Sequence, residues 1–321
     1  MDRRLIAADG LTQSVLEAGE GPLVLLIHGF PELAISWRAQ IEALAAAGYR
    51  VAAPDMRGYG GTGKPPRTED HTILHLVGDM VALVRALGAR SCVVAGHDWG
   101  SAVAWHCALM RPDVFTAVAG LSVPFQPRRA KGPPVAAMRA MAARAGTGDL
   151  YITRFQDPDA HGPFDADPET ALRKMFWAYD GATPREHRHT GFLKPGESMT
   201  AGISDAASLP PWMTPAHFAE YVAAFRAGGF RGPLAWYRCL DLNWALTAWL
   251  QDRTIDVPAL FMTGEHDPVR HYAGRHEQAQ ADWLTDLRGA IEVPGAGHWL
   301  QQERPEAVNA ALLEFLAGVR T

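Results

Sequence analysis

The 321-residue sequence has little cysteine, and its few cysteines are far apart. Cys92 and Cys107 stand in apolar runs, and Cys239 is more than a hundred residues away from either of them. This spacing favours buried free thiols over disulfide bonds or a metal site. We therefore expect a protein of the reducing cytoplasm.

Three further patterns are missing. The formal net charge is -5 and lysine and arginine do not cluster, so the sequence has no basic surface of the kind that binds nucleic acid. No run approaches the roughly 20 apolar residues of a membrane-spanning helix. The N-terminal segment, MDRRLIAADGLTQSV, has no long apolar core of the kind found in secretory signals. We expect neither nucleic-acid binding nor membrane insertion.

What the sequence does contain is an alternation of short apolar runs with helix-like stretches. The runs are rich in β-branched residues and are bounded by turn residues, which is typical of strands buried on both faces. Helical periodicity follows in 36–48 and 71–88. This alternation predicts an α/β fold with a mostly parallel, doubly wound sheet. The apolar runs are PLVLLIHG, YRVAAPD, SCVVAGH, FTAVAGLSV, VPALFMTGE and GAIEVPG.

The strand-like runs disappear in the middle of the chain. Between about residues 127 and 249 the sequence instead has aromatic, proline-rich loops that join amphipathic helices. We predict a discontinuous core of residues 1–126 and 250–321, with an inserted helical cap (lid) of residues 127–249. Such a cap would cover the carboxyl edge of the sheet, where open α/β sheets bind ligands.

A carboxylate stands in a tight turn at GHDWG, residues 96–100. The spacing is that of the G-x-S-x-G nucleophile elbow, with Asp98 in the place of serine. The alternative is that Asp98 merely caps the following helix, but a cap does not require glycine on both sides. We therefore predict that Asp98 is a nucleophile.

An elbow nucleophile needs an acid and a histidine, in that order along the chain. His298 lies in the glycine-flanked loop GAGHW after the last strand-like run, and Asp267 in GEHDPV follows the run before it. Glu265 and Asp256 are alternative acids. An oxyanion hole is predicted from the backbone N–H groups of Phe30, in HGFPE, and Trp99.

With these motifs in place, the sequence resembles the soluble epoxide hydrolase family of the α/β hydrolases over nearly its whole length. The resemblance rests on HGFPE, DMRGYGGTGKP, GHDWGS, LYITRFQDP, LPPWMT, EYVAAFRAGGFRGPLAWYR, GEHDPV and GAGHWLQQERP. It implies that a small-molecule epoxide and water are the substrates and that no cofactor or metal is needed. It leaves a homodimer open.

The resemblance also implies two cap tyrosines that hold the epoxide oxygen. The motif match assigns them to Tyr151 in LYITRFQ and Tyr221 in EYVAAF, with Tyr179 and Tyr237 as reserves. Ala235 in PLAWYR departs from the family, where we expect asparagine. The residues alone favour another role for Tyr221. It belongs to an apolar stripe with helical spacing, which is more often core than catalytic machinery; the other members are Phe218, Val222 and Phe225.

An aspartate nucleophile forms an ester on saturated carbon, which a histidine-activated water can hydrolyse, whereas serine would leave a stable ether. We expect His298 to be the base and Asp267 to orient it. A haloalkane dehalogenase with the same Asp98, or a non-catalytic hydrolase-fold receptor, are the alternative functions. The aromatic residues expected at an apolar substrate pocket, besides Phe30 and Trp99, are Phe155, Trp177, Trp212 and Trp299.

Overall fold

A computed structural model describes residues 1–128, 131–206 and 208–319. Its main sheet has eight strands in the order β1-β2-β4-β3-β5-β6-β9-β10. The β1–β2 and β2–β4 pairs are antiparallel, and the other pairs are parallel. The strands are β1 (Asp2–Ala8), β2 (Leu11–Ala18), β3 (Leu23–Ile27), β4 (Arg50–Pro54), β5 (Cys92–His97), β6 (Phe115–Leu121), β9 (Ala259–Gly264) and β10 (Leu287–Val293).

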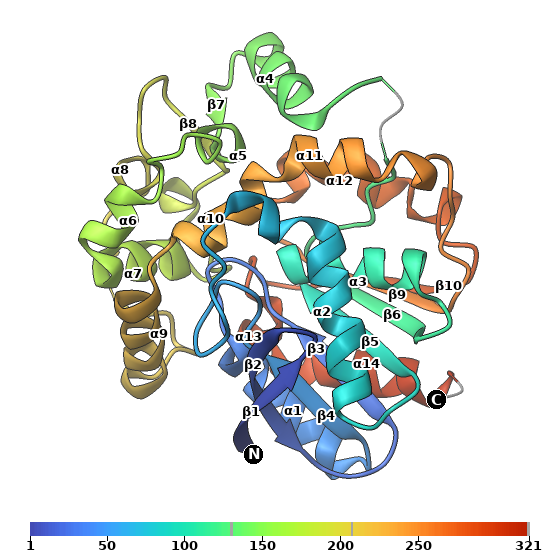
Figure 1. Cartoon of the computed structure of the whole chain (residues 1–321). Helices are drawn as coiled ribbons and strands as arrows, with labels where there is room; N and C mark the ends of the chain where they lie inside the picture. Colours follow the sequence, from blue (N-terminus) through green and yellow to red (C-terminus); the bar gives the residue numbers. More distant parts are fainter. Residues whose placement is uncertain (129–130, 207, 320–321) are drawn as a thin grey trace.

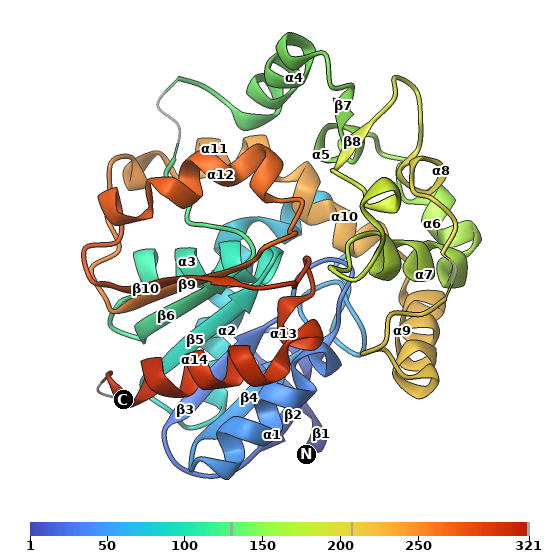
Figure 2. The same cartoon turned by 180° about the vertical axis from the view of Figure 1, so that it is seen from behind.

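The strands β3, β4, β5, β6, β9 and β10 coincide with the six apolar runs, so the predicted α/β fold is confirmed. All residues of β3, β5 and β9 are buried, because helices cover both faces of the sheet there. On one face lie α2 (Ile73–Ala86) and α3 (Trp99–Met110), and on the other α1 (Arg38–Ala46), α13 (Leu300–Glu303) and α14 (Pro305–Ala317) (Figures 1 and 2). Figure 1 also labels α12 (Arg270–Gln278), which follows β9. Four short 3-10 helices accompany these core elements: η1 (Ala34–Trp37), η2 (Thr68–His71), η4 (Ala248–Leu250) and η5 (Gln280–Asp282).

The antiparallel hairpin β1–β2 was not predicted. Most of β1 is exposed, so its sequence carries no burial pattern. The signal that could have found it is the turn Asp9-Gly10, where both residues have positive φ, 48° and 81°. An Asp-Gly pair in this conformation is typical of a two-residue hairpin turn.

Helices dominate the segment between β6 and β9. Figure 1 shows most of them gathered beyond one end of the sheet rather than on its faces. The only strands in this segment, within the described residues, are two residues long: β7 (Asp149–Leu150) and β8 (Phe192–Leu193). We propose that the cap starts and ends near the predicted residues 127 and 249. Its helices are α4 (Pro134–Ala145), α5 (Tyr151–Arg154), α6 (Gly162–Ala166), α7 (Pro168–Ala178), η3 (Arg185–His187), α8 (Met199–Gly202), α9 (Pro215–Gly228), α10 (Arg231–Arg238) and α11 (Leu240–Leu246).

Helix α9 illustrates how the cap sequence determines local structure. Thr214 precedes it, and its hydroxyl accepts a hydrogen bond from the backbone N–H of His217 at 3.2 Å. Pro215 occupies the first helical position, where a missing N–H costs nothing. The predicted stripe of four apolar or aromatic residues is the buried face of this helix. Nowhere in the described ranges is a helix long and apolar enough to cross a bilayer.

Candidate active site

Five side chains or backbone groups meet at the carboxyl edge of the sheet. Each follows the end of a different parallel strand, so the sheet brings together residues that are far apart in the sequence. They are Phe30 after β3, Asp98 after β5, Ser122 after β6, Asp267 after β9 and His298 after β10.

Asp98 occupies a strained turn between β5 and α3, with φ 53° and ψ -120°. A Cβ atom on Gly96 would lie 2.0 Å from the carbonyl oxygen of Gly100, and one on Gly100 would lie 2.1 Å from that of Ile27. Both glycines are therefore required for the close approach of the backbone. The Asp98 side chain makes no helix-capping hydrogen bond, which favours the elbow over a simple cap.

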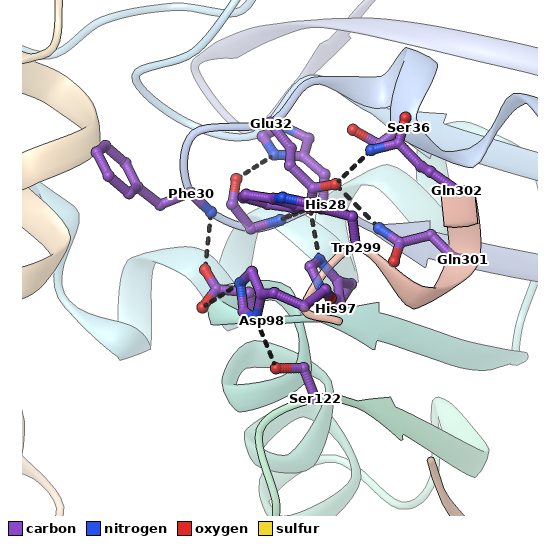
Figure 3. A network of polar contacts seen from close by, with 12 residues as sticks. His28, Phe30, Glu32, Ser36, His97, Asp98, Ser122, Trp299, Gln301 and Gln302 are labelled. Carbon is purple, nitrogen blue, oxygen red and sulfur yellow. Dashed lines mark hydrogen bonds and ion pairs between the residues drawn. The ribbon is translucent and has the colours of Figure 1, made fainter. Parts of the chain in front are cut away.

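The Asp98 carboxylate is buried and points at three predicted partners. Its Oδ1 accepts a hydrogen bond from the backbone N–H of Phe30 at 2.8 Å (Figure 3), and its Oδ2 lies 3.6 Å from His298 Nε2. Burial raises the pKa of Asp98. The nearby histidines and the backbone N–H groups of Phe30 and Trp99 limit this rise, because they favour the charged form. The two predicted oxyanion-hole donors thus both act on this carboxylate.

His298 is oriented by two groups on its other nitrogen. Its Nδ1 lies 3.1 Å from Asp267 Oδ1 and 3.0 Å from Ser122 Oγ. A carboxylate only accepts, so Nδ1 carries a hydrogen, and Nε2 is the nitrogen directed to Asp98. Burial would raise the pKa of Asp267, but the charge and hydrogen bond of His298, with the Ser122 hydroxyl, hold it below its usual value. Sequence reasoning missed Ser122; its place at the end of β6 was the available signal.

The two rival acids are engaged elsewhere. Glu265 accepts a hydrogen bond from the backbone N–H of Gly295 at 2.8 Å. Asp256 accepts from the hydroxyls of Thr254 and Thr285 at 2.8 and 3.0 Å. Of the three candidate acids, it is therefore Asp267 that lies beside His298.

A buried ionic network lies beneath the site (Figure 3). His97 Nδ1 is 2.6 Å from Glu32 Oε2, and His97 Nε2 is 2.7 Å from the carbonyl oxygen of His298. The other Glu32 oxygen accepts from the side-chain amides of Gln301 and Gln302 at 2.9 and 3.2 Å. The network thus ties the elbow to the loop that carries His298.

His97 is held as a cation in this network. Its two nitrogens face a carboxylate and a carbonyl, which are both acceptors, so both nitrogens carry hydrogen. Burial lowers its pKa, but the charge and hydrogen bond of Glu32 outweigh burial and raise it to about 9. Burial likewise raises the pKa of Glu32, and the charge of His97 brings it below its usual value.

This pair predicts a pH-dependent stability. In the unfolded chain His97 loses its proton near pH 6.5, whereas in the folded protein it keeps it up to about 9. The stability that the charged His97–Glu32 pair contributes is therefore fully present below pH 6.5, and it is lost as the pH rises to about 9. We expect the free energy of unfolding, measured by urea denaturation, to fall between pH 6.5 and 9.

The matched control is Glu32→Gln, which removes the charge that holds the His97 proton. We expect this variant to be less stable by about 3 to 5 kcal/mol at pH 7, and its stability to change less across the same pH window. An equal slope in both proteins would contradict the assignment.

Glu303, which no sequence motif singled out, fixes the His298 loop from the other side. Its carboxylate accepts hydrogen bonds from the backbone N–H groups of Gly297 at 2.8 Å and Trp299 at 2.9 Å, the two neighbours of His298. It also accepts from the backbone N–H of Gly181, in the cap, at 2.9 Å. Burial and the nearby Asp180 raise the pKa of Glu303 to about 7. One side chain thus links the catalytic loop to the cap.

Two cap tyrosines reach the space above Asp98. Tyr151, at the start of α5, and Tyr237, in α10, both line the cavities that contain Asp98. Their ring centroids are 5.9 Å apart. Burial and the Asp98 charge raise the pKa of both hydroxyls, so both remain protonated donors; hydrogen bonding with Tyr237 and Tyr272 offsets part of the rise for Tyr151. Tyr272, from α12, is a third tyrosine that sequence reasoning missed.

The assignment of Tyr221 needs correction. Its side chain is buried between the cap and the core, its hydroxyl lies 2.6 Å from Ser36 Oγ in η1, and its ring packs on Phe176 at 5.0 Å between centroids. It lines neither of the two cavities that contain Asp98. The helical stripe on α9 is therefore core, and it is the reserve Tyr237 that lines both cavities with Asp98.

The predicted pocket aromatics also need correction. Trp299 lines a cavity with Asp98, but the other three do not line either cavity described around it. Phe155 lies behind the tyrosine rings, at 5.3 Å from Tyr151 and 5.0 Å from Tyr237 between centroids. Trp177 packs on His187, and the indole N–H of Trp212 donates to Asp180. Apolar character alone could not separate the cavity wall from the cap core.

Comparisons with known proteins agree with the fold and the site described above. Residues 22–305 match the family model described as alpha/beta hydrolase fold. The chain is 44% identical to epoxide hydrolase A of Mycobacterium tuberculosis, over 98% of this chain and 97% of the relative. It superposes on an epoxide hydrolase from an endophytic Streptomyces with a TM-score of 0.94 and 39% identity, over 99% of this chain and 95% of the other. It superposes on the crystal structure of epoxide hydrolase A from Mycobacterium thermoresistibile with a TM-score of 0.92 and 40% identity, over 99% of both chains.

Proposed function

Because the chain belongs to the α/β-hydrolase family and is an epoxide hydrolase within it, we propose that Asp98, His298, Asp267, Tyr151 and Tyr237 perform its reaction. The product is a vicinal diol, made from an epoxide and water through an ester on Asp98. The observation that carries this proposal is the meeting of the Tyr151 and Tyr237 side chains with the Asp98 carboxylate in one cavity.

In the first step an Asp98 oxygen attacks one ring carbon and the C–O bond to the epoxide oxygen breaks. The oxygen takes up negative charge and needs a proton, because an alkoxide is a poor leaving group. Tyr151 and Tyr237 donate hydrogen bonds to it, and Tyr151 transfers its proton. The product of this step is an alkyl ester of Asp98 with a free hydroxyl on the neighbouring carbon.

In the second step His298 Nε2 removes a proton from water, and the water oxygen adds to the carboxyl carbon of the ester. The backbone N–H groups of Phe30 and Trp99 stabilise the oxyanion. The ester C–O bond then breaks, and the diol oxygen takes the proton from His298. The second hydrogen of the water is then on the Asp98 carboxyl group. Its transfer to the Tyr151 phenolate regenerates both residues, and the net reaction is epoxide plus water to diol. Asp267 keeps the imidazole oriented and stabilises its charged form.

A haloalkane dehalogenase would use the same Asp98 but would need N–H donors for a halide. The indole N–H groups of two of the cap tryptophans are bonded to other acceptors. The indole N–H of Trp236 donates to the carbonyl oxygen of Arg57 at 3.1 Å, and that of Trp212 to Asp180. The tyrosine pair therefore supports epoxide opening over halide release.

The tyrosine assignment is tested by single substitutions. We expect Tyr151→Phe and Tyr237→Phe each to slow ester formation by about 100-fold, as the loss of one donor to a developing oxyanion does. Stopped-flow single turnover of styrene oxide measures this step directly.

Tyr221→Phe is the matched control, because it removes a hydroxyl from the same cap. We expect its ester-formation rate to stay within about threefold, with a loss of about 1 kcal/mol in stability from the missing hydrogen bond to Ser36. A large rate loss in Tyr221→Phe together with a small one in Tyr237→Phe would reverse the assignment.

A cytoplasmic location remains part of the proposal. It is supported by Cys92, Cys107 and Cys239, which are buried free thiols. Such thiols are typical of proteins that function in a reducing compartment.

A further inference from the structure

Asp98 lies where two cavities of very different size meet. The larger, here called the large arm, has a volume of about 220 Å³, and the smaller, the small arm, about 20 Å³. Both arms are lined by Asp98, Val269 and the tyrosines Tyr151, Tyr237 and Tyr272. The reacting epoxide ring must sit at this junction, next to its nucleophile and its proton donor.

The large arm extends away from the catalytic histidine. Apolar side chains of α3, α4 and α11 form much of its wall, including Leu109, Met138 and Leu240. It accommodates a large apolar group.

The small arm extends in the other direction, toward His298. Two buried methionines of the cap, Met175 in α7 and Met199 in α8, close it together with Trp299. Gly191 adds no side chain, but its backbone lies against the rings of Tyr151 and Tyr272: a Cβ atom there would be 3.4 and 3.3 Å from them. Since a water molecule requires roughly 10–15 Å³ of such space, the small arm has room for about one water beside the base.

The geometry of ring opening assigns one substituent to each arm. The attacked carbon faces Asp98 and the oxygen faces the two tyrosines, so the ring is held along this axis. The substituents of a trans-1,2-disubstituted epoxide point to opposite sides of the ring. One would enter the large arm and the other the small arm, which cannot hold an aryl or long alkyl group without displacing Met175 or Met199.

We propose that this enzyme selects epoxides that carry their bulk on one ring carbon only over trans-1,2-disubstituted epoxides, and that the small arm is the site of the hydrolytic water. This inference rests on the proposed function of Asp98 and His298. A group in the small arm would oppose both steps, because it would clash during ester formation and would displace the water that hydrolyses the ester.

The first test compares styrene oxide with trans-stilbene oxide on the wild-type enzyme. Both place a phenyl ring on one carbon, but only the second carries another phenyl ring on the other carbon. We expect kcat/KM to be at least 100-fold higher for styrene oxide. Values within tenfold of each other would overturn the selectivity but leave the proposed function standing. Failure to hydrolyse either substrate, or any terminal epoxide, would instead overturn the proposed function.

The second test enlarges the small arm. We expect Met199→Ala to raise the ratio of kcat/KM for trans-stilbene oxide to that for styrene oxide by at least tenfold, and Met175→Ala to do the same if Met199→Ala folds poorly. The matched control is Met138→Ala, which shortens a methionine in the large arm and should leave this ratio within about twofold. An unchanged ratio in folded small-arm variants, or an equal rise in Met138→Ala, would show that the small arm does not set the selectivity.

Discussion

Asp98→Ala is expected to abolish epoxide hydrolysis, with a loss in kcat on the order of 10⁴-fold or more, as for other covalent nucleophiles. The reason is that, among the described residues, Asp98 is the only carboxylate that lines either cavity, and Asp267 is directed to the far nitrogen of His298. Diol formation from styrene oxide, followed by chromatography over a range of enzyme concentrations, measures the residual rate.

The melting temperature of the same variant separates a loss of catalysis from a loss of folding. Burial raises the pKa of Asp98, so the ionised carboxylate opposes folding at neutral pH. Alanine removes this cost but keeps the positive φ of 53°, which is unfavourable by about 1 kcal/mol. We expect the melting temperature to stay near that of the wild type or to rise. An Asp98→Ala protein that is folded and retains more than about one per cent of wild-type turnover would contradict the role of nucleophile.

His298→Gln is expected to turn the enzyme into a trap for its own intermediate. Asp98 and the tyrosines remain, so the ester still forms, but no base activates water to hydrolyse it. Turnover should fall by about 10³-fold, within the range of general-base catalysis. Intact-mass measurement after incubation with styrene oxide should show one added substrate per chain, and peptide mapping should place it on Asp98.

The double variant Asp98→Ala with His298→Gln is the control, since it lacks the attacked carboxylate and should gain no mass. Loss of turnover in His298→Gln without any adduct would mean that His298 acts in ester formation or in folding. An adduct on another residue would contradict the proposed mechanism.

Much of the catalytic layout could be predicted because it is local in the sequence. The apolar runs of β3, β5 and β9 mark strands, and the residues that follow them come together at one edge of a parallel sheet. Asp98 and His298 stand in glycine-flanked turns whose spacing is recognisable without a structure. The sequence also predicts Asp267 as the acid from its place after β9, although two rivals, Glu265 and Asp256, lie within eleven positions.

The site residues of the cap were harder to predict, because no sequence pattern specifies how the cap helices pack against the core. Tyr221 and Tyr237 lie in successive helices, α9 and α10, and both are buried. The sequence pattern around Tyr221 correctly predicted a buried helical face, and that was evidence for packing rather than catalysis. Which tyrosine reaches Asp98 depends on how each helix is rotated against the core, and burial alone does not encode this.

The GHDWG turn shows where the two sources of information divide. By itself the sequence determined the α/β fold, the carboxylate at the elbow and the histidine that follows the last strand, because strand periodicity and glycine turns act over short distances. Only the tertiary structure decided which tyrosine faces Asp98, that Ser122 and Glu303 hold His298, and that the space beside it is nearly closed on one side. Those features arise from side chains far apart in the chain, and packing in three dimensions alone brings them into contact.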